Sequence, residues 1–548
     1  KIIFFFTMTD QSKSIIDIEY EWLFISLSKS LNKIHNTNYD EKFWRKAFYF
    51  GLKRFVGIAY YHYYDINRDK KSYSNNNLIL ADDFERLLWL IRDTDEYYSV
   101  ANRVSKTPDV SNLFDYEVSF QQFEYQKETK SRALLLWLIQ WPAIYLARTL
   151  SIGCFFTTQT HLKIWFKSLG KIIPFKLKRF NSIDQNIQIE KRVLLNNYLS
   201  DDLNQDTNIE FRIFLINFIS TILPTMYLES FDEAFSFYKN QALKFKKVKY
   251  ILSENWFSDA QISFFIAIMH ELNIKFYAID HNGPTVYFKK NVIAETYKIV
   301  DRLYTQGWES LNQSFKNKII QSSSLFSNFR VAHSHINKSM GDKIVFFVAP
   351  AYSKRSLESD IYFYQGSGAP IYLKNQRDFL SGLTQDLQRN IVYRTAPIVL
   401  EKPYAYKTNI DFLIKNSIPM DDLKQKNGVI VLKSTKLAIY DYCATGIFEA
   451  MLMRKPFIVI VDRKLISFSD KYIHLIEELY ELEIFISNAS NAAKVVNRIA
   501  DNPKKWWLEK NRNLKALAFA KIFVDSSDKL INQLVDFSKN KKENANKL

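Results

Sequence analysis

The stretch 429–461, VIVLKSTKLAIYDYCATGIFEAMLMRKPFIVIV, constrains the fold of this chain more than any other. Its apolar pattern predicts a strand at 437–442, a tight turn at 443–446, a helix at 448–453 and a second strand at 457–461. A strand–helix–strand unit of this size implies a parallel sheet, and such sheets bind ligands at the carboxyl ends of their strands. The turn is therefore where a binding site is first expected.

The turn carries the residues of an anion site. Thr445 is predicted to be the helix N-cap, and Gly446 lets a ligand approach the backbone closely. Free N–H groups at a helix N-terminus favour a phosphate. Glu449 lies one place beyond the capping-box position, on the same helix face as Thr445, and could accept hydrogen bonds from sugar hydroxyls. The alternative is a solvated glutamate that stabilises the helix dipole.

Composition narrows the class of protein. A chain of 548 residues is too long for one core, so two or three domains are expected. The net charge of +17 suggests an anionic partner, which could be nucleic acid, an anionic membrane face or phosphorylated substrates. The sequence has no RNA-binding aromatic signature, helix-turn-helix pattern or zinc-ligand spacing, so no nucleic-acid partner is predicted. The two cysteines exclude a disulfide scaffold and fit a reducing compartment.

One apolar stretch bears on membrane association. Residues 133–156 have the length of a membrane span but contain Gln140, Pro142 and Arg148. An arginine near a helix centre costs about 2.5–3.5 kcal/mol on insertion scales, so a buried or membrane-facing helix is expected instead. Basic residues follow between Lys163 and Arg179. Together they predict an anionic inner-membrane surface as a partner, on the cytoplasmic face.

A second α/β unit lies upstream. It is predicted to consist of a strand at 248–252, a helix at 257–272 and a strand at 275–279. A polar turn follows at the carboxyl end of the last strand, where an α/β enzyme places its chemistry. The residues of this turn are Asp280, His281, Asn282 and Gly283.

The remaining pattern gives the fold class. Helices are expected over 15–65, 82–100 and 131–156, with later strands at 344–348, 391–394 and 485–486 and a helix near 376–389. We predict an α/β, GT-B-like chain of two Rossmann-like domains with a largely helical N-terminal part. The expected domains are an acceptor-side domain at 1–315, a linker at 316–342, a nucleotide-sugar-binding domain at 343–510, C-terminal helices at 511–537 and a disordered basic tail at 538–548.

Five motifs resemble a bacterial family of surface-polysaccharide transferases, in consistent order from about residue 17 to 520. They are LNKIHNTNYDEKFWR at 31–45, the 280–283 turn, DRLYTQGW at 301–308, the Thr445–Glu449 pair, and Ile484–Phe485 with Trp506–Trp507. The family has Gln-His-Gly-Gly in the turn, so this chain departs from it at Asp280 and Asn282.

That family is similar to the GT-B enzymes that transfer Kdo, sialic acid and related nonulosonic acids from CMP-activated donors. The resemblance implies a cytoplasmic transferase in lipopolysaccharide or capsule assembly. Its partners would be a nucleotide-sugar and a lipid-linked or growing glycan acceptor. The resemblance leaves the donor sugar, the acceptor and the linkage open.

An inverting glycosyl transfer needs a base for the acceptor hydroxyl and groups that stabilise the leaving phosphate. Asp280 and His281 are the candidate bases, with Asn282 and Gly283 in the acceptor cleft. Glu254, directly after the 248–252 strand, is a second-rank base. The alternatives are an ordinary turn for His281 and a helix cap for Glu254.

Arg394 ends the 391–394 strand and could hold the donor phosphate or a sugar carboxylate through two hydrogen bonds. Its alternative is a surface salt bridge. Thr445 and Gly446 would hold the phosphate, and Glu449 the ribose. Since no Asp-x-Asp element stands in a metal-binding context, we expect no metal and no cofactor beyond the donor.

Three hypotheses follow. The first is the transferase. The second is an inactive membrane-surface scaffold of polysaccharide assembly, in which the altered 280–283 turn has lost its chemistry. The third, supported only by charge, is a nucleic-acid-binding protein, which a salt-dependent gel shift would reveal.

Overall fold

The computed structural model describes the chain in separate stretches. The described residues are 10–68, 153–156, 172–175, 177–178, 180, 188–203, 208–245, 248–253, 260–279, 298–306, 313–322, 341–349, 369–395, 407–421, 428–443, 445–463, 468, 470–523 and 533. They fall into two compact units, divided between Leu303 and Tyr304.

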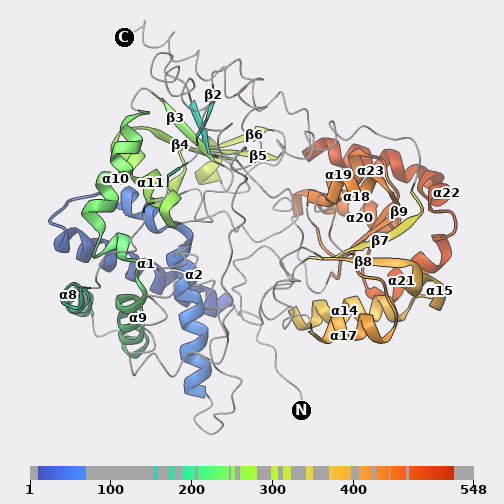
Figure 1. Cartoon of the computed structure of the whole chain (residues 1–548), viewed down its shortest axis with the longest axis horizontal. Helices are drawn as coiled ribbons and strands as arrows, with labels where there is room; N and C mark the ends of the chain where they lie inside the picture. The colour runs from blue at the N-terminus through green and yellow to red at the C-terminus, as the bar shows by residue number, and fades with distance from the viewer. Residues whose placement is uncertain are drawn as a thin grey trace, which may run out of the picture. The chain divides into compact units, whose positions relative to one another are not determined.

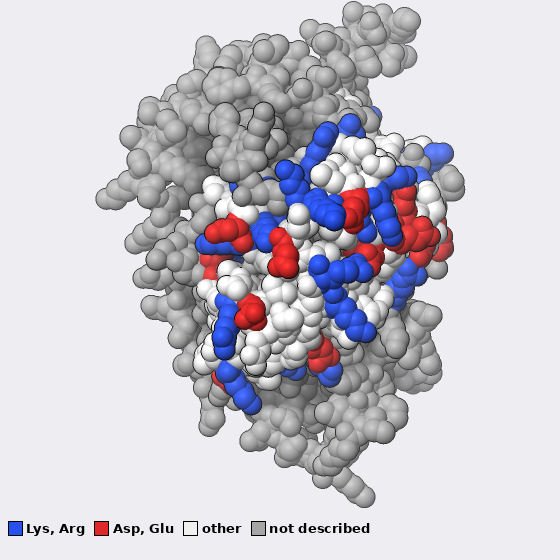
Figure 2. All heavy atoms as spheres, turned by 90° about the vertical axis from the view of Figure 1, so that its right-hand side faces the viewer, with Lys and Arg blue, Asp and Glu red and all other residues white. Residues whose placement is uncertain are grey.

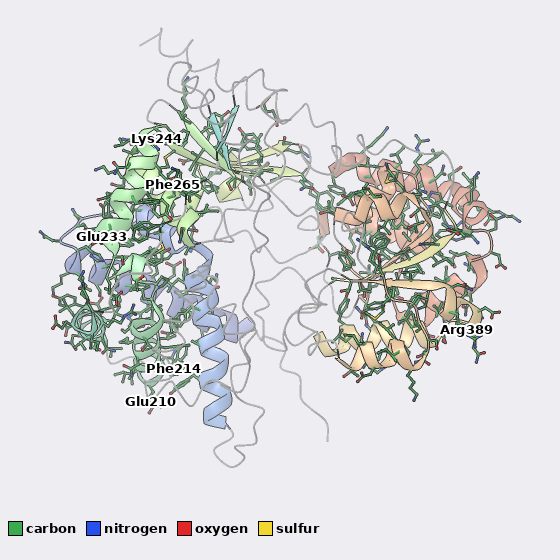
Figure 3. The ribbon with its side chains drawn as sticks, in the orientation of Figure 1. Glu210, Phe214, Glu233, Lys244, Phe265 and Arg389 are labelled. Atoms are coloured by element: carbon green, nitrogen blue, oxygen red, sulfur yellow. The ribbon has the colours of Figure 1, made fainter. Side chains whose placement is uncertain are left out.

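The first unit is largely helical in its N-terminal part, as predicted. Its helices are α1 (Asp10–Ile34), α2 (Glu41–Arg68), α8 (Ile189–Asp201), α9 (Ile209–Ile222), α10 (Phe231–Leu243) and α11 (Ala260–Glu271), with the short 3-10 helix η2 (Thr225–Tyr227). In the core between α10 and α11, Phe265 is fully buried, whereas Glu233 and Lys244 of the same layer are exposed (Figure 3). Burial of aromatic side chains therefore holds this layer together.

The motif at 31–45 forms the turn between α1 and α2. The side-chain oxygen of Asn32 accepts hydrogen bonds from the backbone N–H of Tyr39 (3.2 Å), the hydroxyl of Thr37 (3.0 Å) and the indole N–H of Trp44 (3.1 Å). Trp44 is fully buried, so these three bonds fix the turn against the core. In this chain the motif is a structural device that sets how α2 follows α1.

Two polar residues of that motif, His35 and Arg45, are packing residues whose polar groups have partners within the chain. His35 stacks on Phe231 with ring centroids 4.1 Å apart, and its Nε2 lies 3.0 Å from the carbonyl oxygen of Tyr227. Arg45 donates to both carboxylate oxygens of Glu21. Neither side chain could bind a ligand without breaking these contacts.

The six-stranded sheet has the order β2-β1-β3-β4-β5-β6 (Figure 1). Its strands are β1 (Gly153–Phe156), β2 (Ile172–Phe175), β3 (Tyr250–Ser253), β4 (Lys275–Ile279), β5 (Arg302–Gln306) and β6 (Ile319–Ser322). The pairs β1–β2, β1–β3 and β3–β4 are parallel.

Two sequence-based expectations fail in this sheet. Residues 153–156 were expected to end a helix, but they form strand β1, because a short apolar run fits a buried strand as well as a buried helix. The expected linker at 316–342 begins with part of the 3-10 helix η5 (Gln313–Lys318) and then β6, so its first residues belong to regular structure.

The second unit is built on a five-stranded, entirely parallel sheet of order β11-β10-β9-β7-β8. Its strands are β7 (Lys343–Phe347), β8 (Ile391–Arg394), β9 (Thr435–Tyr440), β10 (Phe457–Ile460) and β11 (Phe485–Ile486). Two Rossmann-like sheets with a helical N-terminal part confirm the predicted α/β class.

Helices cover both faces of this second sheet. On one side lie α14 (Ala369–Ser381), α17 (Lys407–Lys415) and α21 (Ala489–Ile499) (Figure 1). On the other lie α18 (Gly428–Lys433), α19 (Thr445–Leu452), α20 (Ile473–Glu481) and α23 (Arg512–Phe523). Shorter elements are α15 (Gln385–Asn390), α22 (Pro503–Leu508), η8 (Asp470–Tyr472) and η9 (Glu509–Asn511). The helix predicted near 376–389 is thus two helices, α14 and α15.

Among the described helices, none is long and apolar enough to cross a membrane. Most of the apolar stretch at 133–156, and most of the basic segment that follows it, lies outside the described residues.

Candidate functional site

The candidate site lies at the carboxyl edge of the five-stranded sheet. β8 ends in Arg394, Asp441 follows β9, and Asp462 follows β10 shortly after its last residue. Because the strands are parallel, these chain ends meet at one edge, where open α/β sheets bind ligands. Helix α19 begins beside them at Thr445.

Thr445 is the first residue of α19, so the N-cap predicted there is wrong by one position. Its N–H group still belongs to the first turn, whose amides have no partner within the helix. Gly446 packs against Tyr440: a Cβ added at this glycine would meet the Tyr440 ring at 3.0 Å. The absence of a side chain therefore brings the helix start close to strand β9.

Glu449 is only 5% exposed, one helical turn after Thr445. Burial raises the pKa of Tyr440, and the charges of Tyr442 and Glu449 add to that effect. Burial also raises the pKa of Tyr442, with smaller contributions from the charges of Asp441 and Glu449. The carboxylate thus lies among buried phenols, which rules out the solvated surface glutamate.

Arg394 is 6% exposed and forms an ion pair with Asp421. The backbone N–H of Asp421 also donates to the carbonyl oxygen of Tyr393 (2.9 Å), which fixes the acid beside the end of β8. The surface salt bridge considered from the sequence is therefore a pair between a buried arginine and a half-buried aspartate. Such a pair holds the guanidinium in one place, and breaking it by removing one partner typically costs about 3–5 kcal/mol.

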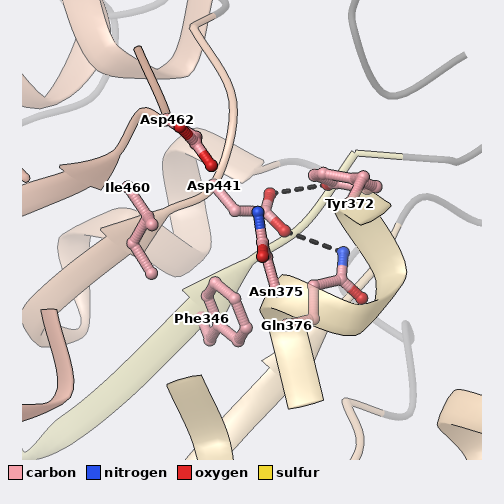
Figure 4. Close-up of a pocket in the computed structure, with 7 residues that line it drawn as sticks. All are labelled: Phe346, Tyr372, Asn375, Gln376, Asp441, Ile460 and Asp462. Carbon is pink, nitrogen blue, oxygen red and sulfur yellow. Dashed lines mark hydrogen bonds between the residues drawn. The ribbon is translucent and has the colours of Figure 1, made fainter. Parts of the chain in front are cut away.

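Asp441 is the site residue that the sequence interpretation missed. Its two carboxylate oxygens accept hydrogen bonds from the Tyr372 hydroxyl and the Gln376 amide of α14, both at 2.7 Å (Figure 4). The Gln376 oxygen in turn accepts from Tyr393 and Asn409, also at 2.7 Å. This buried network ties α14 and α17 to the carboxyl edge. The available signal was an acid near the end of the predicted 437–442 strand, which in the structure ends one residue before Asp441.

Burial raises the pKa of Asp441 from 3.8 to about 7, although its hydrogen bonds oppose the rise. The Tyr372 hydroxyl lies 2.7 Å from Asp441 Oδ1 and 3.3 Å from the Ala349 carbonyl oxygen. Its hydrogen can turn to either acceptor. A proton on Asp441 Oδ1 could then be donated to Tyr372 while Tyr372 donates to Ala349, so the network suits both charge states.

A small pocket opens over this network (Figure 4). Its apolar floor is Phe346 and Ile460, and its polar lining comprises Tyr372, Asn375, Gln376, Asp441 and Asp462. With two carboxyl groups, the pocket suits hydrogen-bond donors such as hydroxyl or amino groups and disfavours phosphate. A phosphate at this edge is better placed at the start of α19.

The family model for the "LIC12162 family transferase" matches residues 8–537. The chain belongs to this family. It is therefore a transferase, and the motifs of the sequence analysis lie within the matched residues. No curated protein matches this sequence.

Solved structures of similar architecture share little sequence with this family member. A UDP co-structure of S. aureus MnaA is 12% identical, with a TM-score of 0.40, over 71% of this chain and 96% of that one. UDP-GlcNAc 2-epimerase from Neisseria meningitidis is 11% identical, with a TM-score of 0.38, over 70% of this chain and 98% of that one. The wall teichoic acid polymerase TagF is 12% identical, with a TM-score of 0.33, over 76% of this chain and 99% of that one.

The predicted acceptor-side residues Glu254, Asp280, His281, Asn282 and Gly283 lie outside the described residues of this transferase. In sequence, Glu254 directly follows β3 and Asp280 directly follows β4. These strands are parallel neighbours. In sequence, each acid thus comes directly after one of two neighbouring parallel strands of the first sheet.

One group of metal-ligand types occurs in the described part of the first unit, although no metal site is predicted. Ligand atoms of Asp40, His270 and Glu271 all lie within 4.8 Å of one another. The buried Lys46 faces the same group, and its charge already acts on His270 and Glu271. An ammonium in this position opposes a second cation, so the group is adequately explained by charge balance with Lys46.

Replacing Asp441 by asparagine should flatten the pH dependence of stability. The folded carboxyl has a pKa near 7 against 3.8 ordinarily, so the folded chain keeps a proton that the unfolded chain has released. Stability in the wild type should accordingly fall as pH rises from about 4 to 7. Asparagine does not titrate, so the variant should lose less stability over this range. Urea unfolding at pH 5 and 8 measures the free energy of unfolding of both proteins. An equal fall in the wild type and in Asp441→Asn would contradict the raised pKa of Asp441.

Proposed function

We propose that this transferase moves a sugar from a nucleotide-activated donor to a bacterial surface glycan, a lipopolysaccharide O-antigen or a capsule. The observation that carries the proposal is the carboxyl edge of the second sheet. There the amide-rich start of α19, the buried Glu449 and the buried Arg394 come together in a member of a transferase family. The resemblance noted above favours a CMP-linked donor such as Kdo or another nonulosonic acid.

The donor would bind to the 343–510 domain. Its phosphate would accept hydrogen bonds from the first-turn amides at Thr445 and Gly446 and from Arg394, which Asp421 holds in position. Its ribose hydroxyls would donate to Glu449. The phosphate then leaves with its charge stabilised by fixed dipoles and a guanidinium, so the reaction needs no metal.

The acceptor would bind to the 1–315 domain, beside Asn282 and Gly283. His281 is the first candidate base for the acceptor hydroxyl, with Asp280 and Glu254 as the others. Attack by that hydroxyl on the anomeric carbon, opposite the leaving phosphate, inverts the configuration. We place the enzyme on the cytoplasmic face of the inner membrane, where lipid-linked or growing glycans are accessible.

A second candidate is an inactive scaffold at the same membrane surface. The departure of Asp280 and Asn282 from the family's Gln-His-Gly-Gly turn favours it. A scaffold of this kind would keep the fold but would not need to bind nucleotide.

A thermal-shift screen against CMP, UDP, GDP and their sugars separates the two candidates. A ligand at a hundred times its Kd stabilises the folded state by about 2.7 kcal/mol, which should raise Tm by roughly 5 °C. We expect that shift with one nucleotide, CMP first. Transfer of labelled sugar to a glycan acceptor would then establish the activity, whereas no shift with any nucleotide would favour the scaffold.

A further inference from the structure

Helices α22 and α23 of the second unit carry an unusual outer surface. In α23, the outward-facing residues include Leu514 and Ile522, which are 51% and 42% exposed, with the exposed Ala518 between them. These positions are spaced by four residues, so they form one stripe along the helix. A helix that covers a domain ordinarily turns polar residues to solvent, and this one turns an aliphatic stripe outward.

Lysines flank the stripe on both sides. Helical geometry places Lys521 at one edge of it and Lys515 at the other. The preceding helix α22 repeats the arrangement, with Leu508 54% exposed beside Lys504 and Lys505. On the face of the molecule drawn in Figure 2, basic and acidic side chains are interspersed among uncharged surface.

The charges of this surface are largely unneutralised. Between Pro503 and Phe523 five exposed lysines face a single exposed acid, Glu509. Of these five lysines, only Lys515 forms an ion pair within the described structure, and its partner is Glu478. The other four lysines are 504, 505, 510 and 521. The structure describes no ion pair for any of them, although the charge of Lys510 helps to lower the pKa of Glu483. The interaction partner should therefore be anionic.

We infer that the α22–α23 surface, defined as the outward residues between 504 and 522, docks on an anionic lipid bilayer. A bilayer offers both parts of the complement: apolar chains for Leu508, Leu514 and Ile522, and lipid phosphates for the lysines, whose long stems can reach them. Nucleic acid would match the charge but leave the aliphatic side chains in water. This surface is distinct from the apolar stretch at 133–156, and the inference does not depend on the proposed sugar transfer.

Binding of the full chain to vesicles tests this inference without any donor or acceptor. We expect the wild type to float with phosphatidylcholine vesicles only when they contain phosphatidylglycerol. The double variant Leu514→Ser/Ile522→Ser should bind about tenfold more weakly because it loses the inserted aliphatic groups. The triple variant Lys504→Gln/Lys510→Gln/Lys521→Gln should lose about a hundredfold.

A matched control lies in the same unit. Ile414 on α17 is 70% exposed and Lys415 is exposed beside it, so Ile414→Ser/Lys415→Gln removes the same kinds of group from another surface. This control should bind like the wild type, and all variants should keep their Tm because the changed residues are exposed. Equal vesicle binding by the wild type and both surface variants would overturn the inference. The inference would also be overturned if only the lysine variant bound vesicles more weakly and random duplex DNA displaced the wild type from the vesicles.

Discussion

Replacing Glu449 by glutamine should lower kcat/KM for sugar transfer by about a hundredfold while leaving the fold intact. A carboxylate that accepts hydrogen bonds from two ribose hydroxyls contributes roughly 1.5–3 kcal/mol for each bond to the charged group. Glutamine keeps the shape but offers one acceptor and a misplaced donor. Glu449 is 5% exposed and lies among buried phenols, so water cannot replace the lost contact easily.

The matched control is Glu481→Gln. Glu481 ends α20 in the same unit and is exposed, so the Glu481→Gln variant should transfer sugar at the wild-type rate. Steady-state kinetics with the donor varied measure the effect, and circular dichroism checks that both variants are folded. Full activity in Glu449→Gln would show that this carboxylate does not hold the donor.

Replacing His281 by alanine should reduce transfer by about 10²–10⁴-fold, the usual contribution of a general base. A base acts only when deprotonated, so the wild-type rate should fall as pH drops below its pKa. If His281 is that base, the alanine variant loses this acidic limb of the kcat/KM profile. His474→Ala is the control, since His474 is exposed on α20.

The same profile distinguishes the three candidate bases. Asp280→Asn and Glu254→Gln should each keep the acidic limb if His281 takes the proton. A wild-type pH profile in His281→Ala would show that His281 is not the base. Loss of the acidic limb in Asp280→Asn would instead assign the base to Asp280.

Local pattern predicted much of the fold. Strand β4 and strand β8 have their expected bounds, and α11 lies within the helix expected at 257–272, because apolar periodicity and a following turn define such elements locally. β1 and β2 did not follow from the sequence. A strand buried in a parallel sheet has no alternation of polar and apolar residues, so GCFF and IIPF carry no strand-specific period.

The site was predictable only where its residues are neighbours in sequence. Thr445, Gly446 and Glu449 share one helix turn, and their spacing indicated an anion site. The pairing of Arg394 with Asp421 joins residues 27 positions apart, and Asp441 meets Tyr372 across 69. Such pairs depend on how strands and helices pack, which the local pattern does not specify. The burial of Glu449 follows from the same packing.

The central claim is that the start of α19, with Glu449, binds the nucleotide. Calorimetric titration tests it most directly, using the nucleotide with the largest thermal shift and comparing the wild type with Glu449→Gln. The account predicts saturable binding by the wild type and a Kd at least about tenfold weaker in the variant. Equal affinity in both, or no nucleotide binding by the wild type, would contradict it.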